Sequence, residues 1–167
     1  MNGRWVILLI ILLNASELKA QLFVQYETAF NRLGWAHEIG VGLIRQEYSY
    51  QVGLKLYEPD FTFEKNFPGL FFKHNWMLFS WEKAFIQTKV EVDLFFEPKA
   101  NVNFWLSNLL VGFQFNRRIS NHFSVNFEIS TGPVLTYTRD TNTDETNRFQ
   151  YFNYQAGLGI AYTFGAN

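Results

Sequence analysis

A histidine, a serine and a glutamate lie close together in the sequence and could form a catalytic group. His122 and Ser124 are two residues apart, and Glu128 follows four residues later. These residue types make up a nucleophilic triad, in which the histidine takes the proton of the attacking hydroxyl. In a strand the three side chains share one face, because side chains alternate with a period of two. The other residues of that face are polar, so we interpret the group as a polar stripe and expect no catalytic site.

A second polar group has the spacing with which a calcium loop begins. Asp140, Asn142 and Asp144 match the first half of that pattern, but Glu145 stands where the loop needs glycine. Tyr151 replaces the glutamate that would bind calcium through both oxygens. Clusters of Asp, Asn and Thr are typical of solvated loops. We therefore expect a surface loop, no metal and no other cofactor.

The composition narrows the class of protein. The 167 residues include no cysteine, 14 Lys+Arg and 15 Asp+Glu, while 19% are aromatic and 17% are charged. A disordered chain is not expected, because disorder needs low hydrophobicity and high charge. A nucleic-acid partner is not expected, because no basic excess is present to neutralise phosphates. The absence of cysteine excludes disulfides, thiol catalysis and Cys-ligated zinc.

The first twenty residues have the order of a secretory signal peptide. Arg4 precedes an unbroken apolar run from Trp5 to Leu13, and a more polar stretch ends in Ala20. Nine apolar residues are too few for a membrane-anchoring helix, which needs roughly 20. We therefore predict an exported protein with a signal peptide over residues 1–20 and one domain over residues 21–167.

The remainder of the chain alternates between apolar and polar residues, as strands with one apolar face do. The last segment is the clearest, with an apolar or aromatic residue at every second position from Phe152 to Phe164. Six segments alternate well: 22–31, 35–43, 48–56, 84–96, 122–130 and 152–164. Two more are less regular, Leu70–Trp81 and Asn101–Asn116, and a bulge near Ser107 and Asn108 would reconcile the second. We therefore expect eight strands in all.

The lengths of the connections favour a membrane barrel. If the N-terminus of the mature chain is periplasmic, the turns near Gln46, near Glu82 and over 117–121 lie on the inner side, and all three are short. The two longest connections, 58–69 and 139–148, lie on the outer side. Short periplasmic turns and longer outer loops are typical of outer-membrane barrels.

The strand pattern and the closing stretch Gly157–Phe164 resemble the small eight-stranded outer-membrane barrels of the OmpA transmembrane domain, OmpX and OmpW type. The resemblance implies an all-β, up-and-down transmembrane barrel in the outer membrane of a Gram-negative bacterium. It also implies outer-membrane lipid, lipopolysaccharide and the barrel-assembly machinery as partners. That machinery reads a terminal aromatic residue in such families, whereas three residues follow Phe164 here.

A soluble, lipocalin-like barrel with the apolar face inward is the alternative fold. Large aromatics on nearly every strand would overfill an eight-stranded interior. In the membrane interpretation, Phe152, Tyr154, Tyr162 and Phe164 form girdles at the two interfaces. The charged residues of the polar face then line the lumen as a mixed network: Glu27, Glu38, Lys55, Lys73, Lys89, Glu91, Asp93 and Glu128.

The last two strands are longer than the 9–11 residues that a membrane strand needs. Pro133 falls outside the hydrocarbon if the preceding residues span it, so the hairpin 133–153 is expected to project. We expect a non-enzymatic structural or surface-interaction role, with Tyr137, Phe149 and Tyr151 contacting an external protein. A narrow pore is one alternative. Another is a lipid-modifying enzyme that uses His122 and Ser124, since lipid A deacylase barrels are similar in using a His-x-Ser pair with a Glu.

Overall fold

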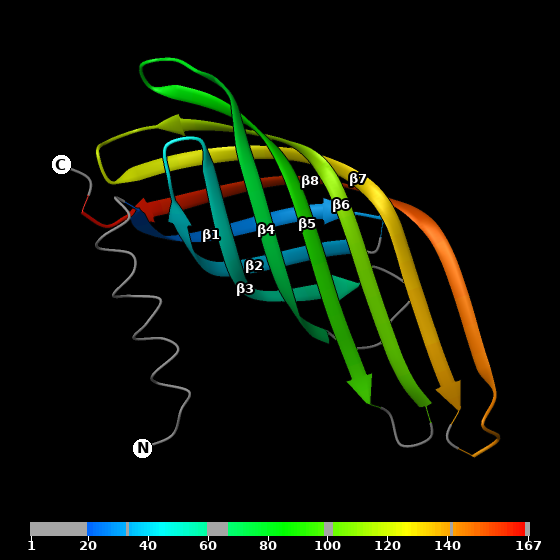
Figure 1. Cartoon of the computed structure of the whole chain (residues 1–167). Coiled ribbons are helices and arrows are strands. Elements are labelled where there is room, and N and C mark those ends of the chain that lie inside the picture. Colours follow the sequence, from blue (N-terminus) through cyan, green and yellow to red (C-terminus); the bar gives the residue numbers. More distant parts are fainter. Residues whose placement is uncertain (1–19, 33, 60–66, 99–101, 141, 166–167) are drawn as a thin grey trace, which may run out of the picture.

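The chain forms a closed antiparallel barrel of eight strands, each paired with its neighbours in sequence, and β8 pairs with β1 to close it. The computed structural model describes residues 20–32, 34–59, 67–98, 102–140 and 142–165 (Figure 1). The strands are β1 (Gln21–Asn31), β2 (Gly34–Ile44), β3 (Tyr48–Pro59), β4 (Phe67–Ser80), β5 (Ala84–Pro98), β6 (Val102–Arg118), β7 (Phe123–Asp140) and β8 (Thr146–Thr163). The expected all-β, eight-stranded up-and-down fold is confirmed.

The polarity of the barrel is the reverse of that in a soluble protein. Apolar side chains cover the outside, where Leu54 is 59% exposed and Leu158 is 67% exposed. Lysine side chains fill the inside, where Lys73 and Lys89 are both fully buried. The lipocalin-like alternative is therefore wrong, because its apolar face would have to point inward. An exterior of this kind needs hydrocarbon around it.

The irregularity in the sheet lies in β4 and not in β6. The pairing of β5 with β6 keeps one register from end to end, so the bulge expected near Ser107 and Asn108 is wrong. The first half of β6 alternates poorly in sequence because Leu106 and Leu110 point into the barrel and are buried there. A register shift between Met77 and Phe79 marks the bulge, in the other segment that alternated poorly.

Four of the strands extend beyond the rest of the barrel. β5 to β8 have 15 to 18 residues, whereas β1 to β3 have 11 or 12. The pairing between β1 and β8 ends at Asn31 and Gln155, but β7 and β8 stay paired as far as Arg139 and Thr146. The expected projecting hairpin is thus part of a larger projecting sheet, formed by the ends of β5, β6, β7 and β8 (Figure 1).

The connections have the expected alternation of sides. Arg45–Glu47, Trp81–Lys83 and Ile119–His122 join strands at the end where β1 begins and β8 ends. The long connection expected over 58–69 is shorter, because β3 continues to Pro59 and β4 begins at Phe67; residues 60–66 lie outside the described part. The expected signal peptide also lies outside it, apart from Ala20. Within the described residues, no helix has the length and apolarity needed to cross a membrane.

Candidate functional site

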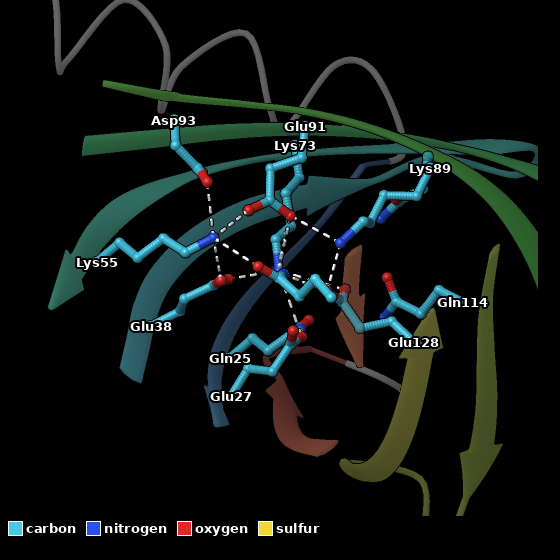
Figure 2. Close-up of polar contacts among 12 residues, drawn as sticks. Gln25, Glu27, Glu38, Lys55, Lys73, Lys89, Glu91, Asp93, Gln114 and Glu128 are labelled. Carbon is cyan, nitrogen blue, oxygen red and sulfur yellow. Dashed lines mark hydrogen bonds and ion pairs between the residues drawn. The ribbon is translucent and has the colours of Figure 1, made fainter. Parts of the chain in front are cut away.

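The centre of the lumen holds a cluster of ion pairs built around Lys73 (Figure 2). The Lys73 amine reaches Glu38 at 2.5 Å and Glu27 at 3.3 Å, on the two strands that begin the barrel. It also lies 3.4 Å from Glu128 on β7 and 3.5 Å from Glu91 on β5. One amine from β4 thus contacts carboxylates from four other strands, so the cluster ties opposite walls of the barrel together.

Two further lysines complete the charged cluster. Lys55 lies 2.6 Å from Glu91, 2.8 Å from Asp93 and 2.8 Å from Glu38, and it donates to the side-chain carbonyl of Gln155 at 3.1 Å. Lys89 lies 2.7 Å from Glu91 and contacts Glu128 closely. All eight charged residues expected to line the lumen lie in this cluster, and each is 0–1% exposed.

Buried charges are tolerated only when they are paired and hydrogen-bonded. The three lysines meet that condition, because each faces two or more carboxylates. Among the described residues it unites five carboxyl groups with three amines. This arrangement fills the middle of the barrel with side chains.

An apolar layer closes the lumen between the charged cluster and the projecting sheet. Tyr57, Phe95, Leu106 and Val134 pack together with Ala36, and all five are 0–1% exposed. The Tyr57 hydroxyl accepts a hydrogen bond from the Asn31 amide at 2.8 Å, so its polar atom is satisfied. Phe104 and Tyr151 pack against this layer from the projecting sheet. The alternation of polar and apolar residues does not predict this layer, because its residues occupy inward positions where the alternation predicts polar side chains.

At the opposite end the lumen widens into a cavity of about 400 Å³. It opens where β1 begins and β8 ends, since Gln21 and Thr163 line it. His122 and Ser124 line the cavity as well, so Ser124 faces the lumen. Glu128 lies in the charged cluster instead, where its carboxylate is bound by Lys73 and Lys89. The Nδ1 of His122 lies 3.1 Å from the carbonyl oxygen of Thr163 and can donate to it.

The segment with calcium-loop spacing forms the turn between β7 and β8. The Asp140 carboxylate accepts hydrogen bonds from the backbone amides of Asn142 at 2.7 Å and Thr143 at 3.2 Å. Asp144 pairs with Arg139 at 2.6 Å, and its carboxylate raises the pKa of the guanidinium. Both carboxylates therefore stabilise the turn. Within the described part of the chain, no group of three or more His, Cys, Asp or Glu side chains is placed to hold a metal ion.

The three expected partner-binding residues do not form a single patch. Tyr137 lies opposite Arg148, whose guanidinium is 5.7 Å from the centroid of the tyrosine ring. Phe149 lies opposite Thr136, and Tyr151 lies opposite Val134, which puts both aromatics on the inner face of the sheet. Burial raises the pKa of Tyr151 to about 12, although the nearby Arg32 guanidinium acts to lower it. Phe149 is 63% exposed, whereas Tyr151 is half-buried.

The residues expected to form aromatic girdles all lie on the outer surface, two of them near the middle of β8, where the projecting sheet begins, and two at or just after its C-terminal end. Phe152 and Tyr154 are 66% and 58% exposed near the projecting sheet. Tyr162 and Phe164 lie at the other end, where their rings pack edge to face at 4.9 Å. Their separation along β8 agrees with the height of a membrane strand.

A polar cluster around His37 lies on the outer surface, and the sequence patterns gave no indication of it. The Nδ1 of His37 lies 2.9 Å from the Tyr26 hydroxyl and 3.2 Å from the Thr28 hydroxyl. Its Nε2 lies 3.7 Å from the Glu58 carboxylate. These residues belong to three adjacent strands, and only the register between the strands brings them together. The cluster satisfies polar groups on an otherwise apolar surface.

Comparison with solved structures identifies the fold. The N-terminal β-barrel domain of Pseudomonas aeruginosa OprF matches with a TM-score of 0.59 at 7% identity, over 86% of this chain and 97% of that one. P. aeruginosa outer membrane protein H (OprH) matches with a TM-score of 0.56 at 12% identity, over 86% of this chain and 99% of that one. A major outer membrane protein from Thermus thermophilus matches with a TM-score of 0.55 at 11% identity, over 87% of this chain and 99% of that one. No protein-family model and no curated protein matches the chain.

The fold and the reversed polarity together define the class of protein, a small integral outer-membrane β-barrel. Within that class the chain has the closed eight-stranded architecture that the resemblance to the OmpA, OmpX and OmpW type implied.

Proposed function

We propose that this outer-membrane barrel is non-enzymatic and presents its projecting sheet to an external protein. The observation that carries the proposal is the edge of β8 over Thr146–Tyr151. This segment pairs with β7 on one side, whereas the described pairing with β1 on the other side ends at Gln155. An exposed strand edge can accept a strand from a partner through main-chain hydrogen bonds. Phe149, within this edge, offers an exposed ring for specificity.

The interior of the barrel supports a closed structural role over a narrow pore. The charged cluster and the apolar layer lie in series along the lumen, and their side chains are 0–1% exposed. Eight-stranded barrels have interiors just wide enough for side chains to fill. Conductance of the purified protein in planar bilayers tests this part of the proposal, and we expect none above the lipid background.

The positions of His122, Ser124 and Glu128 support a non-enzymatic role. An enzyme that cleaves membrane lipid needs its nucleophile on the lipid-facing surface, whereas Ser124 lines the lumen cavity. Glu128 is engaged by two lysines in the charged cluster. Mass analysis of lipid A from cells that carry the wild type or Ser124→Ala tests this point, and we expect identical spectra.

Site-specific photo-cross-linking on intact cells tests the external contact. A photoreactive residue at Phe149 is expected to capture an external protein, while one at Ile119, exposed in the turn at the opposite end, captures none. Deleting residues 138–147 should abolish the contact but leave the barrel heat-modifiable in electrophoresis. Undiminished capture by a shortened barrel that carries the photoreactive residue at Phe152 would overturn the proposal.

A further inference from the structure

The cavity described above lies at the end of the lumen where β1 begins and β8 ends. Its volume of about 400 Å³ is within the range of small-molecule sites, about 300–1,000 Å³. The charged cluster lies beneath it, and the apolar layer around Tyr57 closes the lumen beyond. In the orientation expected from the connection lengths, this opening faces the periplasm. The cavity is therefore a cup and not part of a channel.

Side-chain amides form the floor of the cup. The Gln114 amide donates to the side-chain oxygen of Asn116 at 3.0 Å, and the Asn116 amide donates to that of Gln87 at 3.3 Å. Asn75 donates to the Ser49 hydroxyl at 3.2 Å. This arrangement leaves the Oε1 of Gln114 and the Oδ1 of Asn75 without a hydrogen-bond donor among the described residues.

Both of these oxygen atoms belong to buried side chains that line the cup. Gln114 is 2% exposed and Asn75 is 3% exposed. A buried acceptor without a donor carries the full cost of its desolvation. Both oxygens are covered in the empty cup, so the two amide side chains must turn toward the cavity before the hydroxyl groups of a ligand can supply the missing donors.

Positive charge surrounds the opening. Arg45 lines the cup from the β2–β3 turn, and Arg118 lines it from the end of β6. Each guanidinium lies beside an aromatic ring, since Arg45 is 5.6 Å from the Tyr48 ring and Arg118 is 5.9 Å from the Phe85 ring. No aspartate or glutamate is among the described residues that line the cup. An anionic group is therefore favoured at the opening and not at the floor.

We infer that the cup binds a small hydroxylated anion of monosaccharide size, such as a sugar phosphate, from the periplasmic side. Its hydroxyl groups donate to Gln114 and Asn75, and its anionic group is held by Arg45 and Arg118. Aromatic rings of Phe23 and Phe85 in the wall offer apolar surface to the sugar ring. This binding site lies at the opposite end of the barrel from the projecting sheet and does not depend on the proposed contact there.

Isothermal titration of the refolded protein in a non-ionic detergent tests the inference. Glucose 6-phosphate is the probe, and glucose and inorganic phosphate are its two halves. We expect each half to bind about ten-fold more weakly than the whole, because glucose lacks the group held by the arginines and inorganic phosphate lacks the hydroxyl groups that donate to the floor. Equal binding of inorganic phosphate would overturn the role of the amide floor. Absence of binding by glucose 6-phosphate would overturn the site.

Two variants separate the opening from the floor. Arg118→Gln should weaken glucose 6-phosphate binding about ten-fold, whereas Arg117→Gln, in the adjacent and outward-facing position, should leave it unchanged. Gln114→Leu should weaken glucose 6-phosphate but not inorganic phosphate. Heat-modifiable electrophoresis of each variant establishes that the barrel is closed, so that a loss of binding is a loss of the site. Equal loss in the two arginine variants would contradict the assignment.

Discussion

The ring of Phe95 lies directly over Gly69, its cross-strand neighbour on β4, and a β-carbon on Gly69 would overlap that ring. The same relationship recurs between Phe71 and Gly53, where an added β-carbon would lie 2.7 Å from Cε1 of the phenylalanine. The glycines leave room for aromatic rings inside a barrel that is otherwise too narrow for them. Around these two pairs the interior is thus packed closely.

Gly69→Ala is expected to destabilise the barrel, because the added methyl group forces Phe95 out of its position. Overpacking of this kind costs about 1–3 kcal/mol. Urea unfolding of the protein in lipid vesicles measures the change. The double variant Gly69→Ala/Phe95→Leu should recover part of the loss, since the smaller side chain makes room. A double variant less stable than Gly69→Ala alone would contradict the packing.

Lys73→Met should destabilise the barrel more strongly than loss of an exposed lysine. The substitution keeps most of the side-chain volume but removes the amine that four carboxylates contact. Breaking a buried ion pair by removing one partner costs about 3–5 kcal/mol. The matched control is Lys83→Met, since Lys83 is exposed in the β4–β5 turn. Equal unfolding midpoints for the two variants in urea would show that the charged cluster does not stabilise the fold.

Leu54→Arg tests which surface faces the lipid. Leu54 lies midway along β3 and points outward, and an arginine on the lipid face of a barrel at the membrane midplane costs about 2–4 kcal/mol. Gln150→Arg is the control, because Gln150 is exposed on the projecting part of β8. The fraction of heat-modifiable protein after refolding into vesicles is the measurement. Only the first variant should lower it.

The sequence is sufficient to predict the eight strands and the face on which each charged residue lies. Alternation alone puts Lys55, Lys73 and Lys89 on the polar face, and the structure buries all three. The ion-pair partners are not predictable in this way. They join strands across the lumen, so they depend on strand tilt and register, which no single segment encodes.

The apolar residues that face the lumen are not predicted by the periodicity. Phe95, Leu106 and Leu110 occupy inner positions, where the alternation predicts polar side chains, and this is why β6 suggested a bulge that it lacks. Strand register explains why the expected partner-binding residues do not form one patch. Tyr137 and Phe149 both have odd numbers, but the turn pairs Tyr137 with Arg148, so the two aromatics point to opposite faces.

The ionisation of Tyr151 gives a pH-dependent test of how the projecting sheet packs on the barrel. Burial raises the pKa of this phenol to about 12, above its value of about 10 in an unfolded chain. As pH rises through 10, the unfolded state therefore loses the proton first, and its stability relative to the folded state increases. The stabilisation from the neutral, packed phenol is complete below the unfolded pKa and declines between about pH 10 and 12. Tyr151→Phe should lack this part of the decline in urea midpoint, whereas Tyr137→Phe, on the other face, should retain it. Superimposable pH profiles for the wild type and Tyr151→Phe would show that the phenol is not packed against the apolar layer.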